Sequence, residues 1–187
     1  MASIRGIYYT ATTLDGYIAD EHDSLEWLFE QEGEDGGPAA YEPFIGGVGA
    51  IAMGSTTYLW VTDHLKSSGE AWPYEQPCWV FTHRHLEPVA DNVRFVSGSV
   101  EEHHAAIAES SGGKDIWVCG GGDLAGQFAD AGHLHRVVVS IAPVTLGAGR
   151  PLFPRRFDLE LVELARSGDF ATAIYDVVGP RTDQKQD

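Results

Sequence analysis

The chain has 187 residues, of which 43% are hydrophobic and 21% are charged, an ordinary balance for a globular protein. Its formal net charge of -16, from 12 basic and 28 acidic residues, argues against nucleic acid or an anionic membrane as a partner, because both are bound through lysine and arginine. No apolar run reaches the roughly eighteen residues of a membrane span, and no signal peptide precedes the first strand, so we expect a cytoplasmic protein.

Short apolar segments alternate with helical patterns along the chain. The expected strands, rich in β-branched and aromatic residues, cover residues 4–11, 17–19, 50–54, 78–82, 93–96, 116–119, 136–141, 159–165 and 170–178. The expected helices cover residues 25–28, 41–45, 55–65, 100–109 and 124–131. Asp23-Ser24 and Ser55-Thr56 stand where the N-caps of two of these helices are expected. Residues 30–38 are acidic and glycine-rich, which predicts an exposed, flexible loop.

The order of these elements predicts an α/β fold. Strands that alternate with helices favour a mainly parallel sheet, and two strands about the turn Ser167-Gly168-Asp169 favour an antiparallel hairpin at its C-terminal end. We expect residues 1–180 to form one domain and residues 181–187 to form a polar tail. Ligands of such sheets bind beyond the carboxyl ends of the strands, which is where Gly54, Thr82 and Gly120 fall.

A glycine triplet is the most distinctive feature of the chain. Gly120, Gly121 and Gly122 follow the apolar residues 116–119 and precede a helix. Without Cβ atoms the backbone approaches a ligand closely, and the N–H groups of the first helical turn suit a phosphate or pyrophosphate. The alternative is a tight turn that packs the helix onto the sheet. A dinucleotide-binding G-x-G-x-x-A pattern is completed by Ala125, but the acidic residue expected about twenty positions later is absent.

The cysteines and histidines show no metal-binding pattern. Cys78 and Cys119 each lie in an apolar run, which is typical of free buried thiols in a reducing compartment. None of the eight histidines shows the spacing of zinc ligands, so no metal is expected.

Five motifs occur in order over most of the chain. They are Leu14-Asp15-Gly16-Tyr17-Ile18-Ala19, Leu25-Glu26-Trp27-Leu28, Met53-Gly54-Ser55-Thr56-Thr57-Tyr58, Trp117-Val118-Cys119-Gly120-Gly121-Gly122, and Pro143-Val144-Thr145-Leu146-Gly147-Ala148-Gly149 with Leu152-Phe153. Through them the chain resembles the dihydrofolate-reductase-like family. Within that family it is similar to the C-terminal reductase domain of the bifunctional riboflavin-biosynthesis deaminase/reductase and its stand-alone relatives. The resemblance implies a three-layer α/β sandwich, the use of NADPH and a homodimer.

The resemblance also implies where the cofactor and the substrate bind. The residues expected to contact the cofactor are Gly54, Thr57, Thr82, Arg84, Gly120, Gly121, Gly122, Asp123 and Leu124. The pyrophosphate would lie at the glycine triplet, and the 2′-phosphate would lie at Thr82 and Arg84. A guanidinium suits this place because it grips phosphate with two hydrogen bonds, although Arg84 is alternatively a solvated surface charge. Trp27 and Gly147 would line the substrate pocket, with a core position as the alternative for Trp27.

Two departures from the family pattern bear on function. Ser55 replaces the arginine of the family, which leaves NADH or a flavin nucleotide open beside NADPH. Ser24 stands near the place of the acid of folate reductases, so true dihydrofolate reduction is not expected. Asp15 is then the candidate proton donor, provided that its pKa is raised. The alternative is a turn carboxylate that accepts hydrogen bonds from backbone N–H groups.

These observations predict an NAD(P)H-dependent reductase of a small heterocyclic (pterin- or pyrimidine-like) or carbonyl substrate. The alternative is a nucleotide- or flavin-binding domain of the same fold without reductase turnover. The missing arginine and the unsettled proton donor are the features that favour this alternative.

Overall fold

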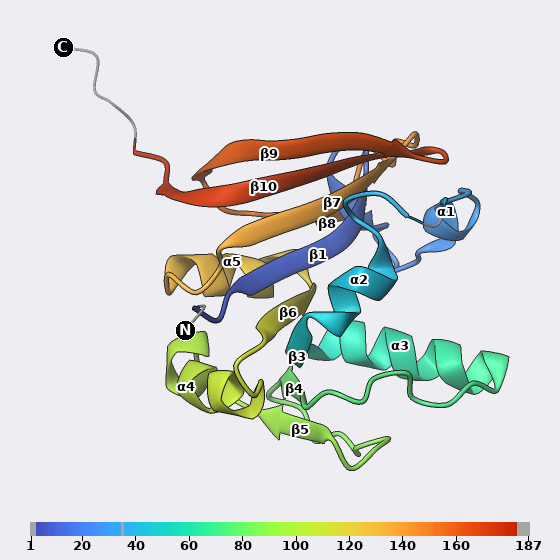
Figure 1. The fold of residues 1–187 in the computed structure, drawn as a ribbon. Coiled ribbons are helices and arrows are strands. Elements are labelled where there is room, and N and C mark those ends of the chain that lie inside the picture. Colours follow the sequence, from blue (N-terminus) through green and yellow to red (C-terminus); the bar gives the residue numbers. More distant parts are fainter. Residues whose placement is uncertain (1–2, 35, 183–187) are drawn as a thin grey trace.

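The computed structural model describes residues 3–34 and 36–182, in which one large sheet carries helices on both faces (Figure 1). The strands of this sheet are β1 (Gly6–Thr13), β3 (Val48–Gly54), β4 (Cys78–Phe81), β5 (Val93–Val96), β6 (Asp115–Gly120), β7 (Arg136–Ala142), β9 (Phe157–Ser167) and β10 (Phe170–Pro180). A small second sheet pairs β2 (Tyr17–Ala19) with β8 (Arg150–Pro151). The helices are α1 (Glu26–Phe29), α2 (Tyr41–Gly46), α3 (Ser55–Ser68), α4 (Val100–Ser110) and α5 (Gly122–Asp130).

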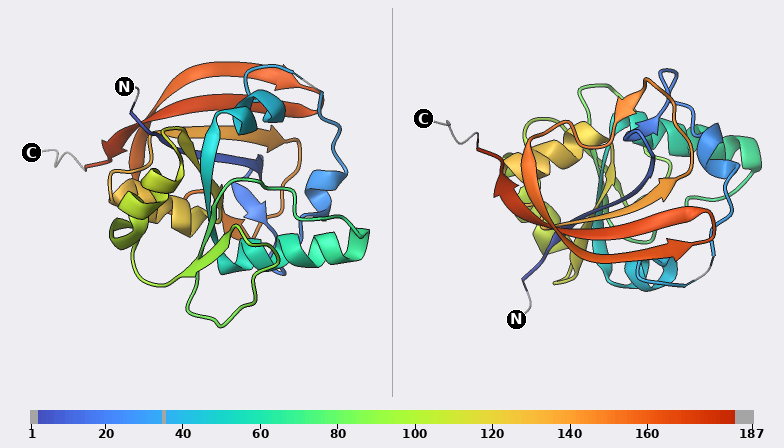
Figure 2. Two further views of the ribbon diagram at one scale, coloured as in Figure 1. Left: turned by 60° about the horizontal axis from the view of Figure 1, so that its bottom comes forward. Right: turned by 90° about the horizontal axis from the view of Figure 1, so that it is seen from above.

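The large sheet has eight strands in the order β5-β4-β3-β6-β1-β7-β10-β9. The first six run parallel to one another, whereas β10 is antiparallel to both β7 and β9. The expected mainly parallel α/β sheet with a C-terminal antiparallel hairpin is therefore confirmed. Both views of Figure 2 show this hairpin, coloured orange to red, at an outer edge of the molecule.

Side-chain alternation along the central strands builds two separate cores. In β3, Ala50 and Ala52 face the cluster that contains α4 and α5, whereas Ile51 and Met53 face the cluster that contains α2 and α3. Trp117 lies on the second side, opposite its neighbours in β6. Successive residues of a strand point to opposite faces, so a strand covered on both faces is apolar throughout. The result is three layers, with the sheet in the middle.

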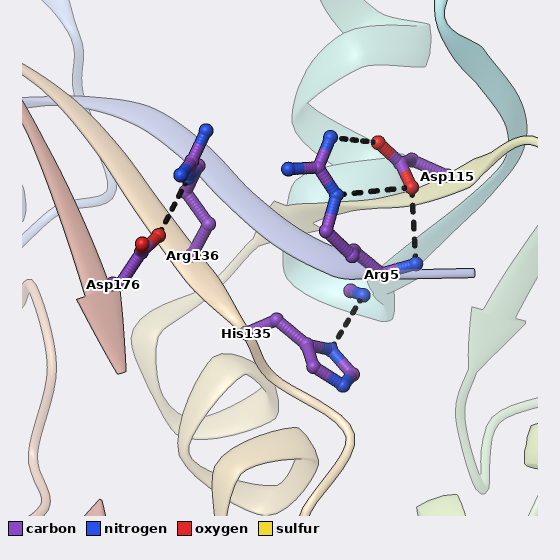
Figure 3. A network of polar contacts seen from close by, with 6 residues as sticks. Arg5, Asp115, His135, Arg136 and Asp176 are labelled. Atoms are coloured by element: carbon purple, nitrogen blue, oxygen red, sulfur yellow. Dashed lines mark hydrogen bonds and ion pairs between the residues drawn. The ribbon is translucent and has the colours of Figure 1, made fainter. Parts of the chain in front are cut away.

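A polar network joins the N-terminal ends of the central strands (Figure 3). The Arg5 guanidinium lies 2.7 Å from the Asp115 carboxylate, and the backbone N–H of Gly6 donates to Nδ1 of His135 at 3.0 Å. Arg136 and Asp176 pair at 2.7 Å on the other side of β1, between β7 and β10. These contacts hold together the end of the sheet that lies opposite the edge where ligands of such folds bind.

The structure places both N-caps one residue away from the expected pairs, although Oγ of Ser24 accepts a hydrogen bond from the N–H of Glu26, the first residue of α1, at 3.2 Å. The N-cap of α1 is Leu25, and Asp23 instead adopts a left-handed conformation with φ of 62°. The N-cap of α3 is Gly54, because the chain passes from β3 into the helix with no intervening residue, which makes Ser55 the first helical position. Neither helix has a side-chain hydrogen bond at its cap.

Two predicted loop segments lie partly outside the described residues. In the loop of residues 30–38, residues 30, 32–34, 36 and 37 are exposed as expected, Gln31 and Pro38 are partly buried, and residue 35 is not described. This loop is anchored to the closing hairpin, since the N–H of Glu32 donates to Asp169 and the N–H of Asp169 donates to the Glu32 carbonyl. Residues 183–187 of the predicted polar tail lie outside the described range.

The outermost strand leaves apolar side chains in contact with solvent. Leu159, Leu161 and Leu164 of β9 are 39%, 53% and 64% exposed. They pair with Val177, Tyr175 and Ala173 of β10, so they extend the sheet face that α5 covers further in. The homodimer stays a prediction, and this exposed apolar strip is a surface through which two copies of the chain could pack. None of the helices in the described part of the chain is long and apolar enough to cross a bilayer.

Gly49→Ala is expected to destabilise the protein by about 1–3 kcal/mol, the usual cost of forcing an extra carbon into a filled site. A Cβ at Gly49 would overlap the carbonyl oxygen of Ser111 and approach Cβ of Lys114 to 2.8 Å. Urea unfolding measures the change. The control is Gly46→Ala in α2, where no atom lies within 4 Å of the added carbon, so stability is maintained or rises. Equal stability of the two variants would contradict the close approach at Gly49.

Candidate functional site

A cavity of about 650 Å³ lies at the carboxyl edge of the parallel strands. The end of β3 and the first turn of α3 contribute Gly54, Ser55, Thr56 and Thr57. The end of β6 and the first turn of α5 contribute the residues from Cys119 to Leu124. The volume falls within the range of roughly 300–1,000 Å³ found for small-molecule sites. Eight of the nine residues expected to contact a cofactor line this one cavity; the ninth, Thr82, does not.

Two helices present their N-termini to this cavity without a side-chain cap. Gly54 is the N-cap of α3 and Gly121 is the N-cap of α5, and neither has a side chain that accepts a hydrogen bond from the helix. By contrast, α4 begins with a complete capping box between Ser99 and Glu102. The first N–H groups of a helix have no partner within the helix and carry the positive end of its dipole. An anion in the cavity would supply the acceptors that α3 and α5 lack.

The three glycines of the triplet have different roles. A Cβ at Gly122 would overlap the carbonyl oxygens of Pro151 and Leu152, so this glycine is required for packing. Gly120 has φ of 152°, and a Cβ there would lie 3.2 Å from Oγ1 of Thr57. At Gly121 the nearest atom to an added Cβ is Cδ1 of Ile18 at 3.6 Å, which leaves its backbone open to a ligand. The packing interpretation of the triplet is therefore confirmed at Gly122, whereas ligand binding at Gly121 stays a prediction.

Arg84 and Arg150 are the arginines that line the cavity. Arg84 is exposed, and its guanidinium makes no hydrogen bond, ion pair or ring contact within residues 3–34 and 36–182. Every other arginine or lysine in those residues has a partner of one of these kinds. In a chain with 28 acidic residues, a cation without a protein partner beside two uncapped helices favours an anionic ligand.

The carboxylate of Asp123 is not free to meet a ligand. It pairs with Arg155 at 3.0 Å and accepts a hydrogen bond from Gln127 at 2.9 Å. The hydrogen bond from Gln127, followed by that from Arg155, lowers the pKa of Asp123, so this side chain is ionised and neutralised by a cation. Asp123 therefore offers the cavity its backbone N–H at the second position of α5, and its charge is directed to Arg155.

Asp15 does not meet the condition set for a proton donor, which is a raised pKa. Asp15 does not line the cavity; its carboxylate accepts hydrogen bonds from Oγ1 of Thr13 at 2.6 Å and from the N–H of Gly147 at 2.7 Å. The N–H of Leu146 donates to the same carboxylate at 3.1 Å. The hydrogen bond from Thr13, then those from the backbone, lower the pKa of Asp15, whereas a donor at neutral pH needs a raised pKa. Asp15 joins the turn after β1 to the loop that precedes β8.

Three further predicted residues lie outside the cavity. Trp27 is 6% exposed and packs against Ala142 and Phe170, so its alternative as a core residue is the correct one. Gly147 is exposed on the outer loop, where its N–H is used by Asp15. Oγ1 of Thr82 accepts a hydrogen bond from the N–H of Arg84 at 2.9 Å, so Thr82 shapes the turn that carries this arginine.

Several residues that line the cavity were missing from the predicted site residues, and four of them supply its walls or its second cation. Ile18 and Leu25 supply an apolar wall from the segment between β1 and α1, and Trp60 supplies an aromatic wall from α3. Trp60 stacks on His64 at 5.0 Å and on Phe29 of α1 at 5.9 Å. Arg150 reaches the cavity from β8. The spacing in the sequence was a signal for Trp60, because residues three positions apart in a helix lie on the same face and Thr57 was already expected at the site.

The thiol of Cys119 also lines the cavity but is not a reactive group. Burial raises the pKa of Cys119 to about 12, so the thiolate is not populated at neutral pH. Within the described residues, Cys78 and Cys119 are free and no three His, Cys, Asp or Glu side chains are grouped to hold a metal ion. The chemistry of the cavity therefore rests on helix N–H groups, hydroxyls, two arginines and apolar walls.

Comparison with known proteins identifies a family. The model of the RibD C-terminal domain matches residues 6–172. The uncharacterized protein YwjB of Bacillus subtilis strain 168 is 30% identical over 171 residues, which are 91% of this chain and 94% of that protein. The uncharacterized protein YyaP of the same strain is 26% identical over 169 residues, 84% of this chain and 86% of that protein.

Solved structures show the same fold. A putative riboflavin biosynthesis protein from Shewanella sp. PV-4 superimposes with a TM-score of 0.77 at 24% identity, covering 93% of this chain and 99% of that one. The diaminohydroxyphosphoribosylaminopyrimidine deaminase/5-amino-6-(5-phosphoribosylamino)uracil reductase of Thermotoga maritima superimposes with a TM-score of 0.62 at 16% identity. That match covers 94% of this chain but 57% of the longer Thermotoga chain.

Asp15→Asn is expected to lower the melting temperature at neutral pH. A carboxylate whose folded pKa is lowered contributes stability above its unfolded pKa, near 4, and loses it as the pH falls through the folded value. The gap between wild type and Asp15→Asn should therefore be full at pH 7 and close below about pH 4. Melting curves followed by circular dichroism between pH 3 and pH 7 measure it.

Asp91→Asn is the control, because Asp91 is exposed and its side chain makes no hydrogen bond or ion pair within the described residues. A variant Asp15→Asn with unchanged melting at every pH but abolished turnover would restore Asp15 as a catalytic residue.

Proposed function

The chain belongs to the RibD C-terminal domain family, and from this premise we propose that it is an NADPH-dependent reductase of a small heterocyclic, pterin- or pyrimidine-like, or carbonyl acceptor. The observation that carries the proposal is Arg84, a cation without a protein partner in the described chain, on a cavity with two uncapped helix N-termini. Three positive features facing one cavity match the separate phosphates of a dinucleotide.

The site residues fit this cofactor. The N–H groups at the start of α5 would hold the pyrophosphate. Gly121 would let the phosphates come close to the backbone, and Leu124 belongs to the first turn of the helix. The start of α3, with the Thr57 side chain beside Gly120, would hold the cofactor from the neighbouring strand. Arg84 at the end of β4 would bind the 2′-phosphate. The hydroxyl of Ser55 lines the cavity where the family has an arginine, so the preference for NADPH over NADH rests on Arg84.

The cofactor, when bound, supplies a hydride: the acceptor carbon gains it, the neighbouring nitrogen or oxygen gains a proton, and the oxidised nicotinamide is the second product. Asp23 and Asp123 are the carboxylates on the cavity, and both are ion-paired with arginines. Both carboxylates are therefore directed to arginines and not to an acceptor. Water is therefore the proton source, and the protein contributes binding, orientation and a partly apolar surround.

A second candidate function is nucleotide binding without reductase turnover. The specific observation that favours it is that both carboxylates among the described cavity residues, Asp23 and Asp123, are paired with arginines. Turnover assays of NADPH oxidation with pterins, pyrimidines and quinones separate the two. Cofactor binding without oxidation of NADPH by any of these acceptors would favour the second function.

The acceptor class is suggested by the relatives. The Thermotoga relative is described as a 5-amino-6-(5-phosphoribosylamino)uracil reductase, and the substrate in that name contains a pyrimidine ring. A pyrimidine or a related fused ring fits a cavity of about 650 Å³ that also has to hold a nicotinamide. Dihydrofolate itself is not proposed, because the acid of folate reductases has no counterpart on the cavity at Ser24.

Arg84→Met is expected to weaken NADPH binding about 10- to 100-fold and NADH binding less than threefold, since only NADPH carries the 2′-phosphate that a charge-assisted pair recognises. Titration with each cofactor, followed by quenching of Trp60 on the cavity wall, measures both affinities. Methionine keeps the length of the side chain and removes the charge. Arg94→Met is the control, because Arg94 lies over the Trp79 ring away from the cavity. Equal losses for NADPH and NADH would remove Arg84 from the 2′-phosphate.

A further inference from the structure

The second arginine on the cavity is neutralised by a carboxylate on the same cavity. Nε of Arg150 lies 2.6 Å from Oδ1 of Asp23, and its NH2 group lies 3.1 Å from Oδ2. This is the two-bonded arrangement that arginine forms with carboxylate and with phosphate alike. Asp23 occupies the Nε and NH2 edge of the guanidinium, so a phosphate would have to compete with this carboxylate for the charge of Arg150.

The local backbone is built to hold Asp23 in this position. Asp23 has φ of 62°, a conformation that few residues other than glycine, asparagine and aspartate adopt. The carboxylate of Asp20 fixes the turn by accepting hydrogen bonds from the N–H groups of His22 and Ser24, each at 2.8 Å. Arg150 is fixed in turn by the pairing of β8 with β2. Asp23 and Arg150 are therefore brought together by two separate segments of the chain.

The two arginines lie at opposite ends of the cavity. Arg84 follows β4, whereas Arg150 belongs to β8, which pairs with β2 directly after β1. In the sheet, β4 and β1 are separated by β3 and β6, a distance of about 14 Å at the usual strand spacing. The helix N-termini lie between them, at β3 and β6. A dinucleotide that extends from Arg84 across α3 and α5 therefore directs its nicotinamide toward the Arg150 end, where the acceptor must lie.

The acceptor end is otherwise apolar and aromatic. Ile18, Leu25 and Trp60 line it, together with Pro151 beside Arg150. Of the described residues on the cavity, none other than Arg84 and Arg150 is lysine, arginine or histidine. A phosphate here would meet the charge of Asp23 in place of a free cation, and burying an uncompensated dianion in a partly closed cavity is strongly unfavourable.

We propose that Asp23 is a specificity-determining residue which, by occupying Arg150, closes the acceptor end to phosphate, so that the acceptor is a neutral planar nitrogen heterocycle without a phosphoryl group. The inference rests on the proposed reductase function and deepens it. It distinguishes this chain from relatives whose named substrate carries a phosphoribosyl group. The flat wall of Trp60 suits a planar ring, which needs no cation to bind.

The test uses the full chain saturated with NADP⁺ and two probes that differ in one group, 5-amino-6-(ribosylamino)uracil and its 5′-phosphate. Cofactor affinity is measured first by Trp fluorescence, and acceptor affinity is then measured by calorimetry. Wild type is expected to bind the riboside at least about tenfold more tightly than the phosphate. In Asp23→Asn, where asparagine tolerates the left-handed backbone, Arg150 is freed and affinity for the phosphate should rise about tenfold.

Asp63→Asn is the matched control, because Asp63 pairs with Lys66 on the exposed side of α3 and does not line the cavity. It should leave both acceptor affinities unchanged. Wild type that binds the phosphate as tightly as the riboside, or that binds neither, overturns the proposal, as does an unchanged phosphate affinity in Asp23→Asn. Failure of NADP⁺ to bind in the first step identifies failure of the reductase function itself, and the acceptor proposal falls with it.

Discussion

The candidate site depends on one constraint, which is that two strands pass directly into helices at glycine. Gly54 ends β3 and Gly121 follows β6, and each is the N-cap of the helix that it begins. A glycine N-cap supplies no side-chain acceptor, so the first N–H groups of α3 and α5 remain available in the cavity. Because β3 and β6 are neighbours in the sheet, these two positive helix ends lie side by side. The proposed binding of cofactor phosphates in the cavity follows from this arrangement.

The scarcity of cations makes their pairing informative. In a chain of net charge -16, arginines are readily satisfied by carboxylates, and Arg150 and Arg155 are both satisfied at the margin of the cavity. These ion pairs leave Arg84 as the cation with which the described chain can meet a phosphate. The proposed site is therefore asymmetric, with an unpaired cation at Arg84 and a paired one at Arg150, beside Asp23.

The sequence predicted the parts of the site that depend on local pattern. Alternation, turn residues and glycine positions identified the strands, the closing hairpin and the strand-to-helix turns at Gly54 and Gly120. Contacts between segments that are far apart in the sequence could not be predicted, because they leave no local pattern. Asp15 reads as a turn residue or as an acid, and the choice depends on the N–H of Leu146, 131 residues away. Arg150 reaches the cavity only because β8 pairs with β2, and a two-residue strand has no periodicity to detect.

The most direct test of the central claim is a crystal structure of the complex with NADP⁺. The arrangement predicts pyrophosphate oxygens about 3 Å from the N–H groups at the start of α5, and the 2′-phosphate on the guanidinium of Arg84. The nicotinamide would then lie between Trp60 and the Asp23–Arg150 pair. A cofactor bound elsewhere, for example in the smaller cavity beside Arg136, or one whose phosphates avoid both helix N-termini, would contradict the account.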